Sequence, residues 1–309
     1  MITTLRSPND FGVSECPPAG EGCHRWLMSA VNTLLRNEIE EEEIIDLTTE
    51  WMTRPPQPRE IENTIRRATQ GAAPSGEYIP KFLPDPIGVK RLTARGPTSF
   101  EEIKAISPID PDWISLTGVL RALYAPIEKT IIFTNERSQG QLVWSHETTQ
   151  EQLDHVLQHN QTGAWFLMNP VTGLYQKIER LGKASRRSEE NTTSFKYLLI
   201  ESDDIEINLW LTILKQLPLR ISSITLSGNS SAHALVQTGA RNKEEWTRVA
   251  REIAAMVVPL GACPGSLTAV RLTRLPKVTR GDNQREQSLL YLNPKPSLLP
   301  LELLPKRMA

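Results

Sequence analysis

Residues 198–203 read LLIESD, and residues 227–236 read SGNSSAHALV. The first stretch is an apolar strand that ends in two acids, Glu201 and Asp203. The second is a tight Gly/Asn turn that leads into a strand carrying His233. Side chains at positions i and i+2 of a strand point to the same face. We therefore expect Glu201 and Asp203 to converge on one divalent cation, Mg²⁺ or Mn²⁺, with His233 in the same pocket.

The turn at residues 227–231 is rich in hydroxyl groups and backbone N–H groups. Such turns form concave nests that bind anions. We therefore predict that Ser227, Ser231 and His233 contact phosphate groups. The alternative for His233 is a core residue whose ring is satisfied by its neighbours.

Arg271 and Arg274 lie three positions apart in the segment VRLTRLP, so they do not follow the alternation of a simple strand. One could face a triphosphate while the other binds a template strand or stabilises the fold. The planar guanidinium, which binds phosphate and carboxylate bidentately, suits both roles. The alternative is a pair of ordinary surface arginines.

The 309 residues include 35 basic and 36 acidic side chains, for a net charge of −1. The net charge therefore does not indicate a nucleic-acid-binding protein, and any basic surface has to be local. Residues 177–187 are locally basic, and we expect DNA to bind there through Lys183, Arg186 and Arg187.

The N-terminal 20 residues lack the apolar core of a signal peptide, and no run of 18 apolar residues predicts a membrane span. We therefore expect a cytoplasmic protein with free thiols at Cys16, Cys23 and Cys263. Cys16, Cys23 and His24 have irregular spacing, so we do not expect a structural zinc there.

Apolar residues at helical spacing predict three helices between residues 20 and 69. Residues 1–69 would form either a plain helical bundle or a small module that binds nucleic acid or a partner. Residues 70–99 are rich in Gly and Pro, which predicts a linker or an extended strap across a neighbouring surface.

Residues 100–309 read as one larger domain in which short apolar strands and helices alternate in mixed order. A hairpin-like pair surrounds Gly228, and a long polar loop spans residues 177–194. This pattern favours an α+β fold over a doubly wound sheet. We predict helices at 112–124, 149–158, 208–216 and 244–260, and strands at 130–134, 141–144, 164–168, 195–201, 221–227, 233–237, 270–275 and 289–292.

Three segments together resemble the motifs of the archaeo-eukaryotic primase (prim-pol) superfamily. They are ESD at 201–203, SGNSSAH at 227–233 and RLTRLP at 271–276. The family motifs are an acid-x-acid strand, an S-G-x(2–3)-x-H element, and a strand with a third acid before a basic segment. Order and spacing match over about residues 160–295. The N-terminal helices are similar to a small helical module often joined to such primases.

The resemblance implies template-dependent nucleotidyl transfer by an α+β domain with an RNA-recognition-motif-like mixed sheet, preceded by a small three-helix domain. It implies that Glu201 and Asp203 hold Mg²⁺ or Mn²⁺. It implies a single-stranded DNA template, and NTP or dNTP bound through Ser227, Ser231, His233, Arg271 and Arg274. No G-x-x-x-x-G-K-[ST] loop is present, so we expect a separate helicase to unwind the duplex.

One position departs from the family pattern. The third acid should lie eight or nine residues before Arg271, where this chain has Ala262 and Cys263. A thiol is a poor ligand for Mg²⁺. Two alternatives therefore stay open beside a primase or polymerase of a bacterial or mobile element: a catalytically weakened replication protein that binds nucleic acid, and a metal-dependent nuclease.

Overall fold

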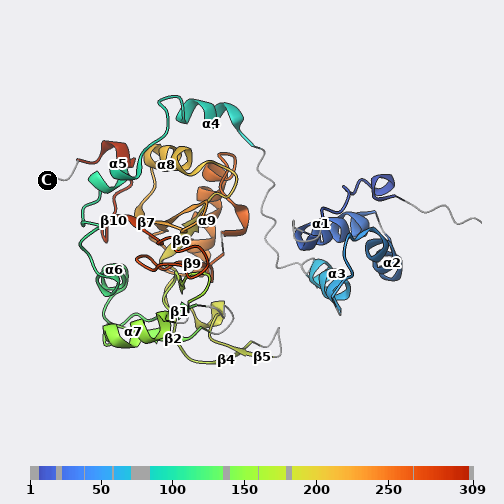
Figure 1. The fold of residues 1–309 in the computed structure, drawn as a ribbon, viewed down its shortest axis with the longest axis horizontal. Helices are drawn as coiled ribbons and strands as arrows, with labels where there is room; N and C mark the ends of the chain where they lie inside the picture. The colour runs from blue at the N-terminus through green and yellow to red at the C-terminus, as the bar shows by residue number, and fades with distance from the viewer. Residues whose placement is uncertain are drawn as a thin grey trace, which may run out of the picture. The chain divides into compact units, whose positions relative to one another are not determined.

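The computed structural model describes residues 7–18, 23–37, 39–57, 59–70, 84–134, 140–158, 160–178, 183–266 and 268–305. The chain divides into two compact units, residues 1–80 and 81–309 (Figure 1). None of the helices in these described ranges is long and apolar enough to cross a membrane.

The first unit packs three helices around a small apolar core. They are α1 (Cys23–Arg36), α2 (Glu41–Trp51) and α3 (Glu60–Gln70), preceded by a short helix, η1 (Pro8–Phe11). Leu27, Leu34 and Ile44 are fully buried at the centre because they recur on the inner faces of α1 and α2. Figure 1 shows the three helices gathered as one bundle.

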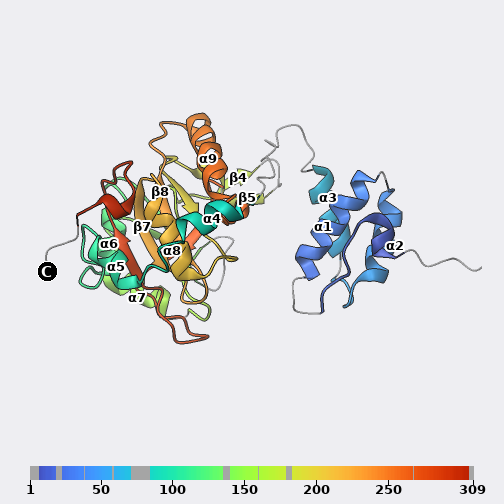
Figure 2. The ribbon, with the colours of Figure 1, turned by 90° about the horizontal axis from the view of Figure 1, so that it is seen from above.

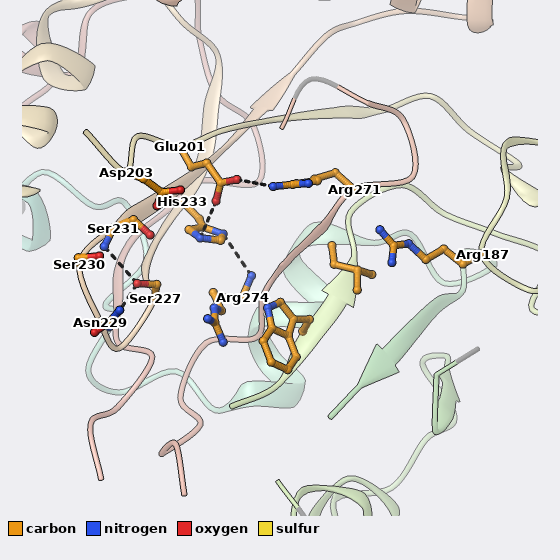
Figure 3. A pocket seen from close by; sticks show the side chains of 12 residues that line it. Arg187, Glu201, Asp203, Ser227, Asn229, Ser230, Ser231, His233, Arg271 and Arg274 are labelled. Carbon is orange, nitrogen blue, oxygen red and sulfur yellow. Dashed lines mark hydrogen bonds and ion pairs between the residues drawn. The ribbon is translucent and has the colours of Figure 1, made fainter. Parts of the chain in front are cut away.

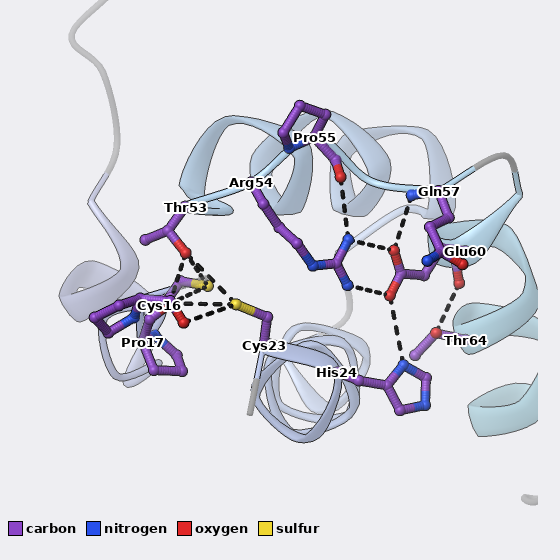
Figure 4. Close-up of polar contacts among 11 residues, drawn as sticks. Cys16, Pro17, Cys23, His24, Thr53, Arg54, Pro55, Gln57, Glu60 and Thr64 are labelled. Atoms are coloured by element: carbon purple, nitrogen blue, oxygen red, sulfur yellow. Dashed lines mark hydrogen bonds and ion pairs between the residues drawn. The ribbon is translucent and has the colours of Figure 1, made fainter. Parts of the chain in front are cut away.

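Two polar clusters hold the start of α1 and α3 in the first unit (Figure 4). Arg54 binds both carboxylate oxygens of Glu60, at 2.9 and 2.6 Å. This bidentate pair, although opposed by partial burial, lowers the pKa of Glu60 to about 2. The thiols of Cys16 and Cys23 instead lie near the Thr53 hydroxyl, at 3.6 and 3.5 Å.

His24 contacts Glu60, with 3.5 Å between Nδ1 and Oε1, rather than the two thiols. Among the described residues, no three His, Cys, Asp or Glu side chains are grouped so that they could hold a metal ion. Cys16 and Cys23 are free cysteines.

The described part of the second unit begins with a short helix that is hydrogen-bonded to the rest of the unit. Helix α4 (Pro86–Leu92) is capped by Asp85, whose backbone N–H bonds to Pro259 O at 2.8 Å. The carbonyl of Leu92 accepts a 2.6 Å bond from Gln216 Nε2 of α8, and Figure 2 shows α4 beside α8. The described part of residues 70–99 thus contains a helix that the expectation of a linker or an extended strap did not include, and residues 71–83 lie outside the described residues.

The strands of the second unit form two four-stranded sheets, with the orders β2-β1-β3-β9 and β10-β7-β8-β6, and one two-stranded ladder, β4-β5. All strand pairs in the described ranges are antiparallel. The α+β prediction is confirmed. The described strands form antiparallel sheets where a mixed sheet was expected, and the RNA-recognition-motif-like arrangement stays a prediction. The elements are α5 (Phe100–Ala105), α6 (Leu116–Leu123), β1 (Thr130–Phe133), β2 (Leu142–Trp144), α7 (Gln150–Leu157), β3 (Trp165–Leu167), β4 (Gln176–Ile178), β5 (Lys183–Ser185), η3 (Glu189–Asn191), β6 (Tyr197–Ile200), α8 (Ile207–Gln216), β7 (Ile221–Leu226), β8 (Ala232–Gln237), α9 (Lys243–Val257), η4 (Pro264–Ser266), β9 (Leu272–Arg274), β10 (Leu289–Leu292) and η5 (Leu301–Leu303).

Helices α8 and α9 pack on the sheet that contains β6 and β8. Trp210 of α8 donates its indole N–H to Ala232 O at 3.2 Å, and Trp246 of α9 donates to Tyr197 O at 2.9 Å. All four residues of β6 are buried. Each buried indole thus satisfies its polar N–H on a strand end while its ring covers the sheet.

Two further regions differ from the sequence-based prediction. Residues 177–194, expected as one long loop, contain part of the β4-β5 ladder and the short helix η3. Helix α5 was not predicted, although Ser99 and Glu102 form a capping box at its start, with Glu102 N to Ser99 Oγ at 3.2 Å. That S-x-x-E spacing was the available signal.

Candidate active site

A cavity of about 420 Å³ opens where the ends of β6 and β8 meet β9 of the other sheet (Figure 3). Its lining contains both predicted acids, the predicted histidine and both predicted arginines of the third motif. The lining residues are Trp165, Arg187, Glu201, Asp203, Ser227, Asn229, Ser230, Ser231, His233, Arg271, Leu272 and Arg274. Segments more than 100 residues apart in the sequence thus build one site.

Glu201 follows β6 directly, so the buried strand delivers its carboxylate to the base of the cavity. The side chain is only 7% exposed. Its Oε2 lies 2.9 Å from His233 Nε2, and its Oε1 lies 2.9 Å from Arg271 Nη2. Both carboxylate oxygens therefore already face a nitrogen donor.

Burial by itself raises the pKa of Glu201, because a charge loses solvation in the protein interior. The hydrogen bonds from His233 and Arg271, together with the charge of Arg271, outweigh burial and lower the pKa to about 2. Glu201 is therefore a carboxylate at neutral pH, held by two partners from different strands.

His233 is held on both sides of its ring. The Nδ1 atom lies 3.3 Å from Thr273 Oγ1 and accepts the backbone N–H of Arg274 at 3.4 Å. A ring nitrogen that accepts a backbone N–H carries no proton, which places the proton on Nε2, facing Glu201. His233 is thus a buried residue whose ring nitrogens both have partners, and it also lines the cavity. Its contact with phosphate stays a prediction.

The turn at residues 227–231 is closed partly on itself. Ser227 Oγ accepts the backbone N–H groups of Asn229 and Ser231, each at 3.2 Å. Gly228 has φ = 70°, and a Cβ added there would lie 2.8 Å from Arg280 Cδ, so the turn needs glycine. The expected anion nest therefore already holds a hydroxyl oxygen, and Asn229, Ser230 and Ser231 line the cavity.

Two further arginines line the cavity and also contact residues around it. Arg274 stacks over the Trp165 ring at 4.3 Å and donates to Thr162 O at 3.1 Å. Arg187 also lines the cavity, and its Nε donates to Val270 O at 3.1 Å. Together with Arg271, three guanidiniums thus line this cavity.

Among the residues predicted to bind DNA, Arg187 lines the cavity. Arg186 is not part of that lining and stacks at 4.2 Å on Tyr175, which is 55% exposed. Lys183 begins β5, and its side chain lies outside the described residues.

Trp165, Asn229 and Ser230 are cavity residues that the sequence-based prediction did not single out. Asn229 and Ser230 lie inside the predicted turn, so their spacing was a usable signal. Trp165 lies in β3, and the pairing of β3 with β9, more than 100 residues later in the chain, sets it opposite Arg274.

Of the two positions where the resemblance leads us to expect a third acid, Cys263 lies beside Asp203. Its Sγ lies 3.9 Å from Asp203 Oδ2, whereas Ala262 is buried in the apolar core. Burial, together with the nearby charges of Asp203 and Glu201, raises the pKa of the Cys263 thiol. The group beside Asp203 is therefore a neutral thiol at neutral pH.

These donors do not fit a preformed metal centre. Mg²⁺ and Mn²⁺ prefer carboxylate and other oxygen ligands, but both oxygens of Glu201 face cationic or N–H groups, and Cys263 offers a neutral thiol. Asp203 is the one acid of this cavity that is exposed. Glu201 and Asp203 both line this cavity, but a three-ligand cluster is not found among the described residues. Their convergence on one divalent cation stays a prediction.

No protein-family model matches the chain, and no curated protein matches it. Among solved structures, the chain is similar to the AEP domain of the cyanophage S-2L primase-polymerase. The two are 14% identical, with a TM-score of 0.39, over 57% of this chain and 90% of the other. A likeness at this TM-score does not decide the function, which we infer below from the cavity.

Proposed function

We propose that the chain is a nucleotidyltransferase of the primase-polymerase type, which holds the triphosphate of an NTP or dNTP in this cavity. The observation that carries the proposal is the meeting of three guanidiniums, a hydroxyl-lined turn and two carboxylates in one cavity of about 420 Å³. Arginine forks bind phosphate oxygens bidentately, and a cavity lined by cations favours a polyanion.

Each side chain has a role in this proposal. Arg271, which precedes β9, and Arg274, which ends it, would contact phosphates together with Ser231 and His233. Glu201 would hold the His233 ring in place through the 2.9 Å contact. Asp203, exposed at the rim, is the carboxylate that is open to a reacting hydroxyl or to a cation. We expect transfer to need Mg²⁺ or Mn²⁺, although the donors of this cavity do not form a preformed metal centre.

The template in this proposal is single-stranded DNA, which would approach past Arg187 toward Tyr175. Tyr175 is 55% exposed and carries the guanidinium of Arg186 at 4.2 Å over its ring. Exposed aromatic rings and arginines serve as stacking surfaces for unpaired bases. The biological setting we propose is replication or repair of a bacterial or mobile element in the cytoplasm, with a separate helicase.

A second candidate function is nucleotide binding without transfer, as part of a replication protein. Two observations favour it. Cys263 replaces the acid expected beside Asp203, and Glu201 is already neutralised by Arg271. On this reading the cavity would sense or hold nucleotides while a partner performs the chemistry.

Synthesis on a single-stranded DNA template distinguishes the candidates. Purified protein is incubated with labelled NTPs or dNTPs, in separate reactions with Mg²⁺, Mn²⁺ or EDTA, and dinucleotides and extended primers are resolved on a gel. Metal-dependent products that disappear in Asp203→Asn support the transferase. Nucleotide binding without product supports the second candidate, and DNA cleavage without added nucleotide indicates a nuclease.

A further inference from the structure

The carboxylate of Glu201 has a resident cation in the structure. Arg271 Nη2 lies 2.9 Å from Oε1, and His233 Nε2 lies 2.9 Å from Oε2. The Arg271 side chain is 37% exposed, whereas Glu201 is only 7% exposed. A partly exposed guanidinium thus covers a buried carboxylate from the cavity side.

A divalent cation that approached Glu201 would meet this guanidinium. Two like charges at contact distance repel strongly where solvent screening is reduced, as at a carboxylate this deeply buried. His233 closes the other oxygen, and the neutral Cys263 thiol offers no compensating charge. In the absence of nucleotide, the cavity therefore disfavours the binding of a divalent cation at Glu201.

The guanidinium of Arg271 is also placed to bind a polyanion. Arg271 precedes β9 and lines the cavity together with Arg187 and Arg274. Its long side chain leaves Glu201 by rotation about side-chain bonds alone, because the backbone is held separately. Met168 N–H donates to Arg271 O at 3.3 Å, and Arg271 N–H donates to Thr268 O at 3.2 Å. A phosphate in the cavity would compete with Glu201 for this fork.

We propose that Arg271 and a divalent cation are mutually exclusive partners of Glu201, and that nucleotide binding is what exchanges them. The nucleotide enters as a metal-free polyanion, takes Arg271 onto its phosphates, and so opens Glu201 beside Asp203. The first half of this inference concerns the protein alone, and only the exchange rests on the proposed function. Nucleotide and cation then strengthen each other's binding, as reciprocal coupling requires.

The test measures cation binding without any nucleotide. Mn²⁺ is titrated into the full chain, and free Mn²⁺ is followed by electron paramagnetic resonance. We expect Arg271→Ala to raise Mn²⁺ affinity at least about tenfold over the parent, because a like charge is removed from Glu201. Arg271→Lys, which keeps the charge, should stay within about threefold of the parent.

Arg274→Ala is the matched control, because Arg274 contacts Trp165 and Thr162 rather than Glu201. It should leave Mn²⁺ affinity unchanged. In EDTA, ATP binding is measured by calorimetry, and both Arg271→Ala and Arg274→Ala should weaken it about tenfold. If Arg271→Ala does not fold, Arg271→Gln removes the charge and keeps a hydrogen-bonding side chain.

If the parent and the neutral Arg271 variants bind Mn²⁺ with equal affinity, Arg271 and the cation are not mutually exclusive partners of Glu201. ATP affinity in EDTA that Arg271→Ala leaves unchanged overturns the exchange. If no nucleotide binds under any condition while the Mn²⁺ effect is present, the proposed function fails and the exclusion stands.

Discussion

Glu201→Gln tests whether the buried carboxylate supports the fold as well as the site. Glu201 is 7% exposed and makes two contacts of 2.9 Å, to Arg271 and His233. The amide that replaces one carboxylate oxygen is itself a donor, so it faces a second donor across the contact. The substitution removes the negative charge and leaves Arg271 beside an apolar strand end.

Removing one partner of a fully buried ion pair costs about 3–5 kcal/mol. Arg271 is 37% exposed and regains water, so we discount this to about 2–3 kcal/mol in the free energy of unfolding. For a domain of 150–250 residues, each kcal/mol lowers the melting temperature by about 2–4 °C, which gives a decrease of about 4–12 °C. Asp203→Asn is the control, since Asp203 is exposed and should change stability by less than about 0.5 kcal/mol.

The assay is urea unfolding at pH 7, followed by circular dichroism, with thermal scans as a second measurement. Linear extrapolation gives the free energy of unfolding for the parent and for both variants. If Glu201→Gln is as stable as Asp203→Asn, the carboxylate does not hold Arg271 and His233 as described. Arg271 would then not be a cation held at the carboxylate of Glu201.

Three further predictions concern other parts of the chain. Cys263→Asp should raise Mg²⁺-dependent synthesis about tenfold, equivalent to about 1.4 kcal/mol of barrier, while Cys263→Ser should not; equal rates in both variants would remove Cys263 from the mechanism. Replacing Arg186 and Arg187 by Ala should flatten the dependence of log K for single-stranded DNA on log salt by about 0.7 per lost phosphate contact; an unchanged slope in filter binding would contradict this. The pKa of Glu60 is lowered from 4.5 to about 2, so its pair with Arg54 stabilises the fold above pH 4.5 and is lost as pH falls toward 2; acid unfolding of Glu60→Gln should be less steep in that window, and parallel curves would count against the pair.

The common position of Glu201, Asp203 and His233 in one cavity was predictable from their spacing in the sequence. Glu201 and Asp203 stand at i and i+2 after an apolar strand, and His233 lies in the strand that pairs with it, where Ile200 faces Ala234. Strand alternation and the short turn therefore bring them together without knowledge of the rest of the fold. The predicted boundaries of β10 match the structure, since apolar residues fill the whole strand.

The division into two sheets was not predictable from local pattern. Strand β9 pairs with β3, about 100 residues earlier, through Trp165 and Arg274. Nothing in the segment VRLTRLP indicates which sheet it joins. For the same reason, the Glu201–Arg271 pair could not be anticipated, because it joins the end of one sheet to the start of a strand in the other.

The most direct test of the central claim is template-dictated incorporation. The protein is given single-stranded DNA of one repeated base, one labelled nucleotide at a time, and Mg²⁺ or Mn²⁺. We predict phosphodiester-linked products only with the complementary nucleotide, and their loss in Asp203→Asn and His233→Ala, both of which alter cavity residues. Absence of product with every nucleotide and both metals, together with no measurable nucleotide binding, would contradict the account.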